Sequence, residues 1–302
     1  MKTSFKSSGA NIRIISFFMS VILTLLLSTG TNAQLLSPDG QAERMGGEAP
    51  AERNVQKTVT VYVNNQKYGG RAYLINSVTY VGIREFSMHM GVTSVSWDSG
   101  TKTATVRSDK LTISANNQSM YIIANGRYLF AKTGVIIKNS TMYVPLRTIA
   151  KAFGATVSWD QKKFAAYVEG SSLIESAASY YDPDDLYWLS RIIHAESVGE
   201  PLLGKIAVGT VVQNRVKSSL FPNSVYEVIF DKKNGVQFTP TVNGAINCTP
   251  GEESIIAAKL CLDGASISDK ALFFVNEALA QSSWVSDNRS FIVTVGNHKF
   301  YA

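Results

Sequence analysis

The first apolar segment of the chain is a continuous run from Ile14 to Leu27, followed by the small-residue sequence Thr31-Asn32-Ala33. The residues before the run include three basic and no acidic side chains: Lys2, Lys6 and Arg13. This order is typical of a secretory signal peptide, and the run is shorter than the roughly 20 residues of a membrane-spanning helix. We therefore predict a signal peptide over 1–33 and an exported protein with no stable membrane span after cleavage; an uncleaved anchor is the alternative.

Residues 57–168 follow a different pattern, in which short alternating segments are separated by turns that contain Asn or Gly, and the pattern occurs twice. Arg84 recurs 63 residues later as Arg147, and Trp97 recurs 62 residues later as Trp159. Each copy predicts a strand, a turn, a strand, a short helix and a strand. One such unit cannot bury its own apolar face, so we expect the two copies to pack together. The polar segments 34–56 and 169–181 flank the repeat and are predicted to be linkers.

Helical periodicity begins at residue 182, where Asp182 can cap a helix and Pro183 suits its first position. Leu189, Ile192 and Glu196 lie on one stripe of that helix, with Leu186 and Ile193 beside them. A carboxylate on an apolar face is costly unless it lines a cleft or is paired, and burial raises its pKa, as a general acid requires. The pattern therefore indicates Glu196 as a catalytic acid. The alternative is a helix-end Glu that faces solvent before Gly199.

The rest of 182–302 is predicted to be mainly helical with a small β element. Residues 202–216 are apolar nearly all round and predict a buried central helix. Ser224 with Glu227, and Thr249 with Glu252, are spaced as capping boxes that open two further helices, and Gly264 can end the second. Residues 271–275 and 291–295 have the composition of strands. The fold class is α+β, with a duplicated small α/β repeat domain before the helical domain.

Charge and metal-binding residues exclude several classes of function. The formal net charge is +6 and falls to +3 if the three basic residues of the signal peptide leave. No Lys/Arg cluster remains in the mature chain, so nucleic acid is not a predicted partner. A mildly cationic exported protein is attracted to an anionic wall or membrane surface, although solubility alone explains the charge equally well. Three scattered histidines and two cysteines have no metal-ligand spacing, so we predict no metal and no cofactor. Cys248 and Cys261 can form a disulfide or remain free thiols.

The repeat resembles the copper amine oxidase-like N-terminal domain of exported proteins from Gram-positive bacteria. The resemblance covers about 110 residues and rests on the pattern YVPLR…A…FGA.VSWD at 143–160. The repeat has one His and no Cys, so neither copper binding nor oxidase chemistry follows. In that family the module is accessory. We predict that it binds the wall, with a spacer or dimerisation unit as the alternative. Trp97 and Trp159 can stack on sugars or belong to the core.

Residues 184–302 resemble the catalytic domain of the spore cortex-lytic enzyme and related cell-wall hydrolases, the SleB family. The matching blocks occur in the family's order: LSRIIHAESVGEP, GKIAVGTVVQNRVKSSLFPNSVYEVIF, QFTP, ALFFVN and VGNHKFY. The resemblance implies a lysozyme-like or lytic-transglycosylase-like fold and makes Glu196 the catalytic acid. Four further positions match family blocks and are expected to bind substrate or support the cleft: Glu200, Gln237, Phe238 and His298. The implied partner is the glycan strand of peptidoglycan, in the cell wall, the spore cortex or outside the cell.

The implied reaction cleaves the bond between N-acetylmuramic acid and N-acetylglucosamine. A hydrolase needs a second carboxylate, and Glu200, Asp231 and Asp263 are candidates only by proximity in sequence. A lytic transglycosylase needs none, because the C6 hydroxyl of the sugar attacks and Glu196 returns as base, so transglycosylation is favoured. The alternatives are an amidase that cuts the muramoyl–alanine bond, which normally employs zinc, and a non-catalytic wall-binding protein.

Overall fold

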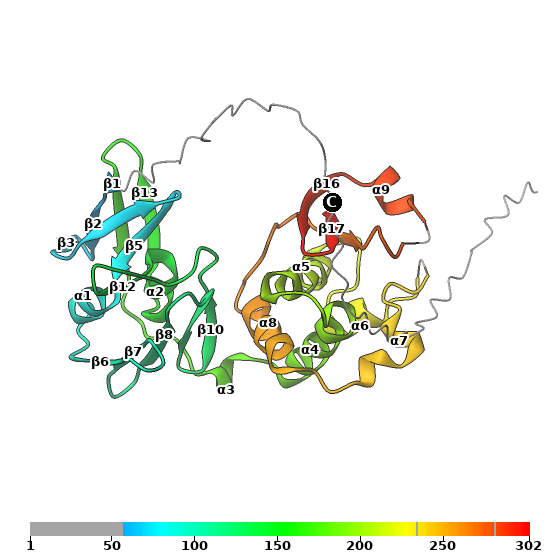
Figure 1. Ribbon diagram of the computed structural model, residues 1–302, viewed down its shortest axis with the longest axis horizontal. Coiled ribbons are helices and arrows are strands. Elements are labelled where there is room, and N and C mark those ends of the chain that lie inside the picture. Colours follow the sequence, from blue (N-terminus) through cyan, green and yellow to red (C-terminus); the bar gives the residue numbers. More distant parts are fainter. Residues whose placement is uncertain (1–56, 234, 281) are drawn as a thin grey trace, which may run out of the picture. The chain divides into compact units, whose positions relative to one another are not determined.

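The computed structural model describes residues 57–233, 235–280 and 282–302 (Figure 1). The predicted signal peptide (1–33) and the first predicted linker (34–56) lie outside these residues. Among the described helices, none has the length and apolar character needed to cross a membrane.

Each copy of the repeat contains two hairpin-like strand pairs, a short helix and a further strand pair. The first copy comprises β2 (Thr60–Val63), β3 (Gln66–Lys67), β4 (Ala72–Ile75), β5 (Val78–Gly82), α1 (Ile83–His89), β6 (Ser94–Asp98) and β7 (Thr103–Arg107). The second comprises β9 (Tyr121–Ala124), β10 (Arg127–Phe130), β11 (Ile136–Lys138), β12 (Thr141–Pro145), α2 (Leu146–Ala152), β13 (Thr156–Asp160) and β14 (Ala165–Glu169). β1 (Lys57–Thr58) precedes the first copy, and β8 (Thr112–Asn116) lies between the copies. The copies are therefore richer in strands than the sequence pattern predicts, because each helix is followed by two strands.

The two copies are related by an approximate twofold axis. β5 pairs antiparallel with β12, and Val81 faces Val144, the residue at the same position of the other copy. The sheet through this axis has the order β1-β4-β5-β12-β11. Two further sheets mix the copies, because β2 of the first pairs with β14 of the second. Both copies consequently share one apolar core, in which the rings of Phe86 and Phe153 pack edge to face with centroids 6.0 Å apart.

The segment 169–181, predicted to be a linker, carries structure of its own. It contains the short helix α3 (Ala177–Tyr180). Ile174 belongs to the core of the repeat, and Tyr181 is 8% exposed. The segment is therefore polar in composition, but two of its side chains, Ile174 and Tyr181, are buried.

The helices of the C-terminal domain surround the predicted central helix. They are α4 (Pro183–Ser197), α5 (Leu202–Lys217), α6 (Val225–Phe230), α7 (Pro240–Asn243), the 3-10 turn η1 (Ala245–Asn247) and α8 (Glu252–Leu262). α5 is buried along most of its length, as its apolar sequence predicts. Leu189, Ile192 and Ile193 of α4 lie in the core with side chains inaccessible to solvent. The stripe predicted for α4 therefore faces the interior.

Two predicted helix starts are confirmed and one is wrong. The Asp182 carboxylate accepts hydrogen bonds from the backbone N–H groups of Asp184 and Asp185, at 2.9 and 3.0 Å. The Ser224 hydroxyl accepts from the Glu227 N–H at 3.2 Å and caps α6. Thr249 does not cap α8, because the chain is still extended at Gly251, which is the N-cap residue and provides no side chain. Gly264, with φ +91°, follows α8 and allows the chain to turn, as predicted.

A small sheet completes the domain (Figure 1). It has the order β15-β17-β16, with β15 (Phe273–Val275), β16 (Phe291–Val295) and β17 (His298–Tyr301), and α9 (Trp284–Asn288) lies between the first two in sequence. The strand predicted over 291–295 is confirmed, whereas the one predicted over 271–275 begins two residues later. The central strand β17 escaped prediction, because its four residues alternate too briefly to stand out. The α+β fold class, with a mainly helical C-terminal domain and a small β element, is confirmed.

Candidate active site

A cavity of about 820 Å³ opens beside the C-terminal end of α4. Glu196 of α4 and Arg215 of α5 lie in its wall together with residues of β15 and α9. The loops after α5 and before α7 also contribute, with Phe221 and Gln237 among their residues. The cavity is more than twice the volume of a groove in the repeat domain, which measures about 370 Å³. Its size suits several units of an extended ligand.

Glu196 is half-buried at this cavity and is poorly hydrated. Burial raises the pKa of its carboxyl group from 4.5 to about 7, and the positive charge of Arg215 opposes the increase. A carboxyl group with this pKa keeps a large protonated fraction near neutral pH. The side chain can therefore donate a proton to a bound ligand and take one back, as an acid–base catalyst must.

Arg215, which the sequence analysis did not single out, is the buried cation of the site. Its Nε–H donates to the Leu272 carbonyl at 2.9 Å, and its guanidinium carbon lies 4.8 Å from the Phe221 ring centroid and 5.1 Å from that of Phe238. Its Nη1 is buried without a hydrogen-bond partner in the described part of the chain. Burial lowers the pKa of Arg215 to about 10, so the group remains charged at neutral pH. The sequence offered no signal that singles out Arg215, because Lys217 is also basic and lies in the same last turn of α5.

Aromatic side chains and a second arginine form the outer wall. The guanidinium carbon of Arg289 lies 4.5 Å from the Phe273 ring centroid and 5.1 Å from the Trp284 ring. Trp284 is 52% exposed, so much of the indole is open to a ligand. Aromatic rings stack on the apolar faces of sugars, and arginines bind carboxylates and carbonyl oxygens. The wall is therefore suited to a sugar that bears acidic or amide groups.

The two predicted site residues before α7 have different surroundings. Gln237 lines the cavity, and its Nε2 donates to the Gly235 carbonyl at 3.2 Å. Phe238 is 1% exposed and packs in the domain core behind Arg215. Gln237 is thus placed to touch a ligand, whereas Phe238 supports the cavity from behind.

Glu200 and His298 lie together and are not among the residues that line the cavity, although the His298 ring packs edge to face on Phe274, a lining residue, with centroids 5.4 Å apart. The Glu200 carboxylate accepts hydrogen bonds from the Asn297 backbone N–H at 3.2 Å and from its side-chain amide at 2.8 Å. His298 Nδ1 lies 3.5 Å from Glu200 Oε1. Burial lowers the pKa of His298, and the Glu200 charge opposes that shift. This buried cluster connects the turn between α4 and α5 to the β16–β17 turn.

Asp263 and Asp231, the remaining candidates for a second catalytic carboxylate, have different surroundings. Asp263 is 6% exposed and is engaged by Arg127 and by the Tyr181 hydroxyl, which donates at 2.5 Å, so it is not part of the cavity wall. Asp231 interacts electrostatically with Arg215 and accepts the Lys233 N–H at 2.9 Å. Among the described residues that line the cavity, Glu196 has the one acidic side chain.

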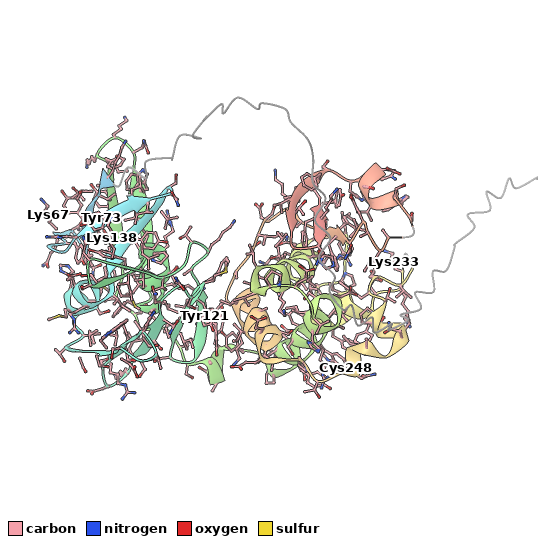
Figure 2. All side chains as sticks on the ribbon, in the orientation of Figure 1. Lys67, Tyr73, Tyr121, Lys138, Lys233 and Cys248 are labelled. Atoms are coloured by element: carbon pink, nitrogen blue, oxygen red, sulfur yellow. The ribbon has the colours of Figure 1, made fainter. Side chains whose placement is uncertain are left out.

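The cysteines and histidines give no metal site in the described ranges, where no group of three or more His, Cys, Asp or Glu side chains converges. Cys248 is exposed directly after η1 (Figure 2). Cys261 is buried in α8, and both cysteines are free thiols.

Within the described residues, the fold consists of the repeat domain and a helical domain that holds the carboxyl group of Glu196, largely protonated near neutral pH, in a ligand-sized cleft. Residues 199–301 match the family model described as Cell Wall Hydrolase, and residues 61–168 match the Copper amine oxidase N-terminal domain. The C-terminal part is therefore a cell wall hydrolase domain, and the repeat is a copper amine oxidase N-terminal domain. Glu196 lies three residues before the matched segment of the former.

Curated relatives share the C-terminal part of the chain. The spore cortex-lytic enzyme of Bacillus cereus (strain ATCC 14579) is 36% identical over 120 residues, which cover 40% of this chain and 45% of that enzyme. That of Bacillus subtilis (strain 168) is 34% identical over 120 residues, covering 40% of this chain and 38% of the enzyme. The chain thus spans less than half the length of these relatives. Among solved structures, the catalytic domain of the germination-specific lytic transglycosylase SleB from Bacillus anthracis is 35% identical, with 40% of this chain and 97% of that chain covered and a TM-score of 0.37.

Proposed function

We propose that the C-terminal domain cleaves the bond between N-acetylmuramic acid and N-acetylglucosamine in peptidoglycan, as a lytic transglycosylase. The observation that carries this proposal is the Glu196 carboxyl group, whose pKa burial raises to about 7 within a large cavity that has aromatic walls. The domain's family and its spore cortex-lytic relatives support the choice of substrate. The protein then acts outside the cytoplasm, on the cell wall or the spore cortex.

In the first step Glu196 donates its proton to the bridging oxygen. The bond between that oxygen and C1 of the muramic acid breaks, and positive charge develops at C1. The C6 hydroxyl of the same sugar then attacks C1, and the Glu196 carboxylate accepts the hydroxyl proton. One product strand ends in a 1,6-anhydro sugar and so has no reducing end, and the other carries a free hydroxyl on the leaving glucosamine. Glu196 is again protonated.

The composition of the cavity wall favours this route over hydrolysis. Hydrolysis uses a second carboxylate as nucleophile or base. Among the described wall residues Glu196 has the one acidic side chain, whereas Asp263 and Glu200 are buried in contacts elsewhere. The intramolecular attack by the C6 hydroxyl needs only the group that Glu196 provides.

The test is a digestion of purified peptidoglycan from both spore cortex and vegetative wall, followed by mass spectrometry of the products. Anhydromuramic ends are expected. Reducing ends would instead identify a muramidase, free peptides an amidase, and unchanged peptidoglycan a non-catalytic binding protein; each of these results overturns the proposal. Comparison of the two substrates also determines whether the enzyme prefers cortex.

Glu196→Gln is the decisive variant, because it keeps the shape of the side chain and removes the proton donor. We expect activity to fall by about 10²- to 10⁴-fold. Glu252→Gln is the matched control, since Glu252 is an exposed glutamate in the first turn of α8 and should retain full activity. Equal activity of Glu196→Gln and the parent would refute the assignment.

A further inference from the structure

The repeat domain has two grooves at equivalent positions of its two copies. The Trp159 groove, of about 370 Å³, contains Arg147 and Trp159. The Trp97 groove, of about 130 Å³, contains Arg84 and Trp97. The arginines are 63 residues apart in sequence and the tryptophans 62, so each groove combines the same two repeat positions.

Each groove is built from both copies. The Trp97 groove takes Ser140 from the β11–β12 turn of the second copy, and the Trp159 groove takes Ser77 from the β4–β5 turn of the first. These serines occupy the same position of two-residue turns and both have positive φ, 57° and 63°. The grooves are thus equivalent products of the twofold arrangement, and neither could form in a single copy.

A small residue keeps each groove open beside its tryptophan. Trp97 faces Ala104 across the β6–β7 pair, and Trp159 faces Ala166 across β13–β14. Both alanines are buried and both line the grooves. Because neighbouring strands place facing side chains together, an alanine leaves room for a ligand next to the indole.

Packing in the core does not by itself explain the tryptophans and arginines of the two grooves. Trp97 is 45% exposed, and Arg84 and Arg147 are also exposed. Trp159 is partly buried against Phe164, and its Nε1–H already donates to Gln161 at 2.8 Å. An exposed indole beside an arginine and a serine hydroxyl provides what a pyranose ring with an acidic substituent needs: an apolar surface, a cation and a hydrogen-bonding group.

The charge of the domain indicates the sign of the ligand. Residues 57–168 contain 14 Lys and Arg but only 4 Asp and Glu, a formal charge of +10. Residues 182–302 contain 10 basic and 13 acidic residues, a formal charge of −3. The positive charge is therefore concentrated in the repeat domain, which will attract an anionic polymer. Near the Trp159 groove, Lys57 Nζ lies 5.9 Å from the ring of Phe164, a groove residue.

We propose that the two grooves bind the carboxylate-bearing glycan strand of peptidoglycan and hold the chain on its substrate. The identity of the polymer rests on the proposed function of the catalytic domain. A polyol-phosphate wall polymer would satisfy the charge, but its backbone offers no sugar face to the two indoles. Two weak sites on one polymer give a combined affinity well above that of either site.

The test is co-sedimentation of the full chain with purified peptidoglycan stripped of phosphate polymers. All proteins carry Glu196→Gln, so the substrate stays intact during the measurement. We expect Trp97→Ala to weaken binding by about three- to tenfold, and its combination with Trp159→Leu to weaken binding by considerably more. Met88→Ala is the matched control, because Met88 is 55% exposed on α1 and lies outside the residues that line either groove, and it should bind like the parent.

Three results would overturn the proposal: unchanged binding by the folded double variant, unchanged binding by Trp97→Ala, or binding only to walls that retain phosphate polymers. Thermal unfolding shows whether the double variant is folded. If it is not, Trp97→Ala decides the question, because a side chain that is nearly half exposed contributes little to the core.

A second measurement separates this proposal from the proposed catalytic function. With Glu196 intact, the groove variants should cut short soluble glycans at the parental rate and lose activity only on insoluble peptidoglycan. Failure of Glu196 as the acid would show as soluble fragments released by Glu196→Gln, whereas failure of the grooves would show as equal binding by the groove variants and the Met88→Ala control, which all carry that same substitution. Equal losses on soluble and insoluble substrates would contradict the anchoring role.

Discussion

Glu196 and Arg215 line the same cavity, and their charges are coupled. Burial raises the pKa of the Glu196 carboxyl group to about 7, while the positive charge of Arg215 holds it below the value that burial alone would set. The arginine is itself kept in place by the Leu272 carbonyl and by aromatic rings. The helix α5 therefore provides the cation that adjusts the acidity of a group on α4.

The first prediction concerns the pH dependence of cleavage. The reaction needs the protonated form of Glu196, so kcat/KM should be level below a pH of about 7 and fall about tenfold per pH unit above it. The measurement is kcat/KM on soluble glycan fragments between pH 5 and 9, a range in which the substrate's carboxylates stay ionised. An activity that rises across pH 7 would contradict a proton-donating role.

The second prediction separates the charge of Arg215 from its packing. Arg215→Met removes a positive charge that stabilises the Glu196 carboxylate, so the alkaline limb of the pH profile should move upward by roughly half a unit to one unit. Arg215→Lys keeps the charge and should leave the limb near its parental position, even if the loss of the Leu272 contact lowers the rate. If Arg215 had only a structural role, both substitutions would change the rate and neither would shift the alkaline limb of the pH profile.

The third prediction is a change in stability with pH. The folded-state pKa of Glu196 lies above the unfolded value, so between pH 4.5 and about 7 the folded protein binds more protons than the unfolded one. The contribution of Glu196 to the unfolding free energy is therefore full below pH 4.5 and is lost as pH rises through about 7, by an amount of the order of 3 kcal/mol. Urea unfolding at pH 5 and pH 8 measures the loss. Glu196→Gln should lack this part of the difference, and an identical difference in both proteins would contradict the raised pKa.

The sequence predicted the elements that depend on local signals. The helix starts at Asp182 and Ser224, the buried helix α5 and the twofold repeat of the first domain all follow from capping residues and periodicity. Glu196 was placed correctly on the apolar stripe of α4, although its position at the cavity follows only from how the helices pack.

Contacts between distant segments account for what was missed. Arg215 becomes a site residue because β15 and the loop after α5 meet around it. Glu200 matches a block of the family, but its carboxylate accepts a hydrogen bond from Asn297 in the β16–β17 turn, 97 residues further along the chain. No local pattern reveals a partner at that separation.

The fourth prediction tests the Glu200 cluster through a glycine. Gly296 has φ +58°, and a Cβ atom there would lie 1.7 Å from Glu200 Oε2. Glu200 is 6% exposed and bonded to Asn297, so it cannot swing away at little cost. Gly296→Ala should cost several kcal/mol, from backbone strain of about 1–2 kcal/mol together with the lost Glu200 contacts.

Gly264→Ala is the control for Gly296→Ala. It also has positive φ, +91°, but a Cβ atom there meets nothing within 4 Å, so it reports the strain alone. The measurement is the difference in unfolding free energy between the two variants. Equal losses of unfolding free energy would mean that Glu200 moves aside for the added Cβ atom at little cost.

The fifth prediction assigns separate roles to the acids near the site. Asp263 pairs with Arg127, and the side chains are only 1% and 7% exposed, so Asp263→Asn leaves a buried cation without its partner. The expected loss of stability is roughly 3–5 kcal/mol, with unchanged kcat per folded molecule. Asp269→Asn, at an exposed aspartate six residues further on, should change stability by less than about 0.5 kcal/mol.

Asp231 decides between the two chemical routes, because it is the candidate acid that interacts electrostatically with Arg215. If the C6 hydroxyl is the nucleophile, Asp231→Asn should keep activity within about tenfold of the parent, since it then affects only the local charge. If water or a carboxylate attacks instead, the parent enzyme itself should leave reducing ends, and Asp231→Asn should cost about as much activity as the loss of Glu196. The product ends made by the parent, together with kcat of Asp231→Asn, therefore distinguish the two routes.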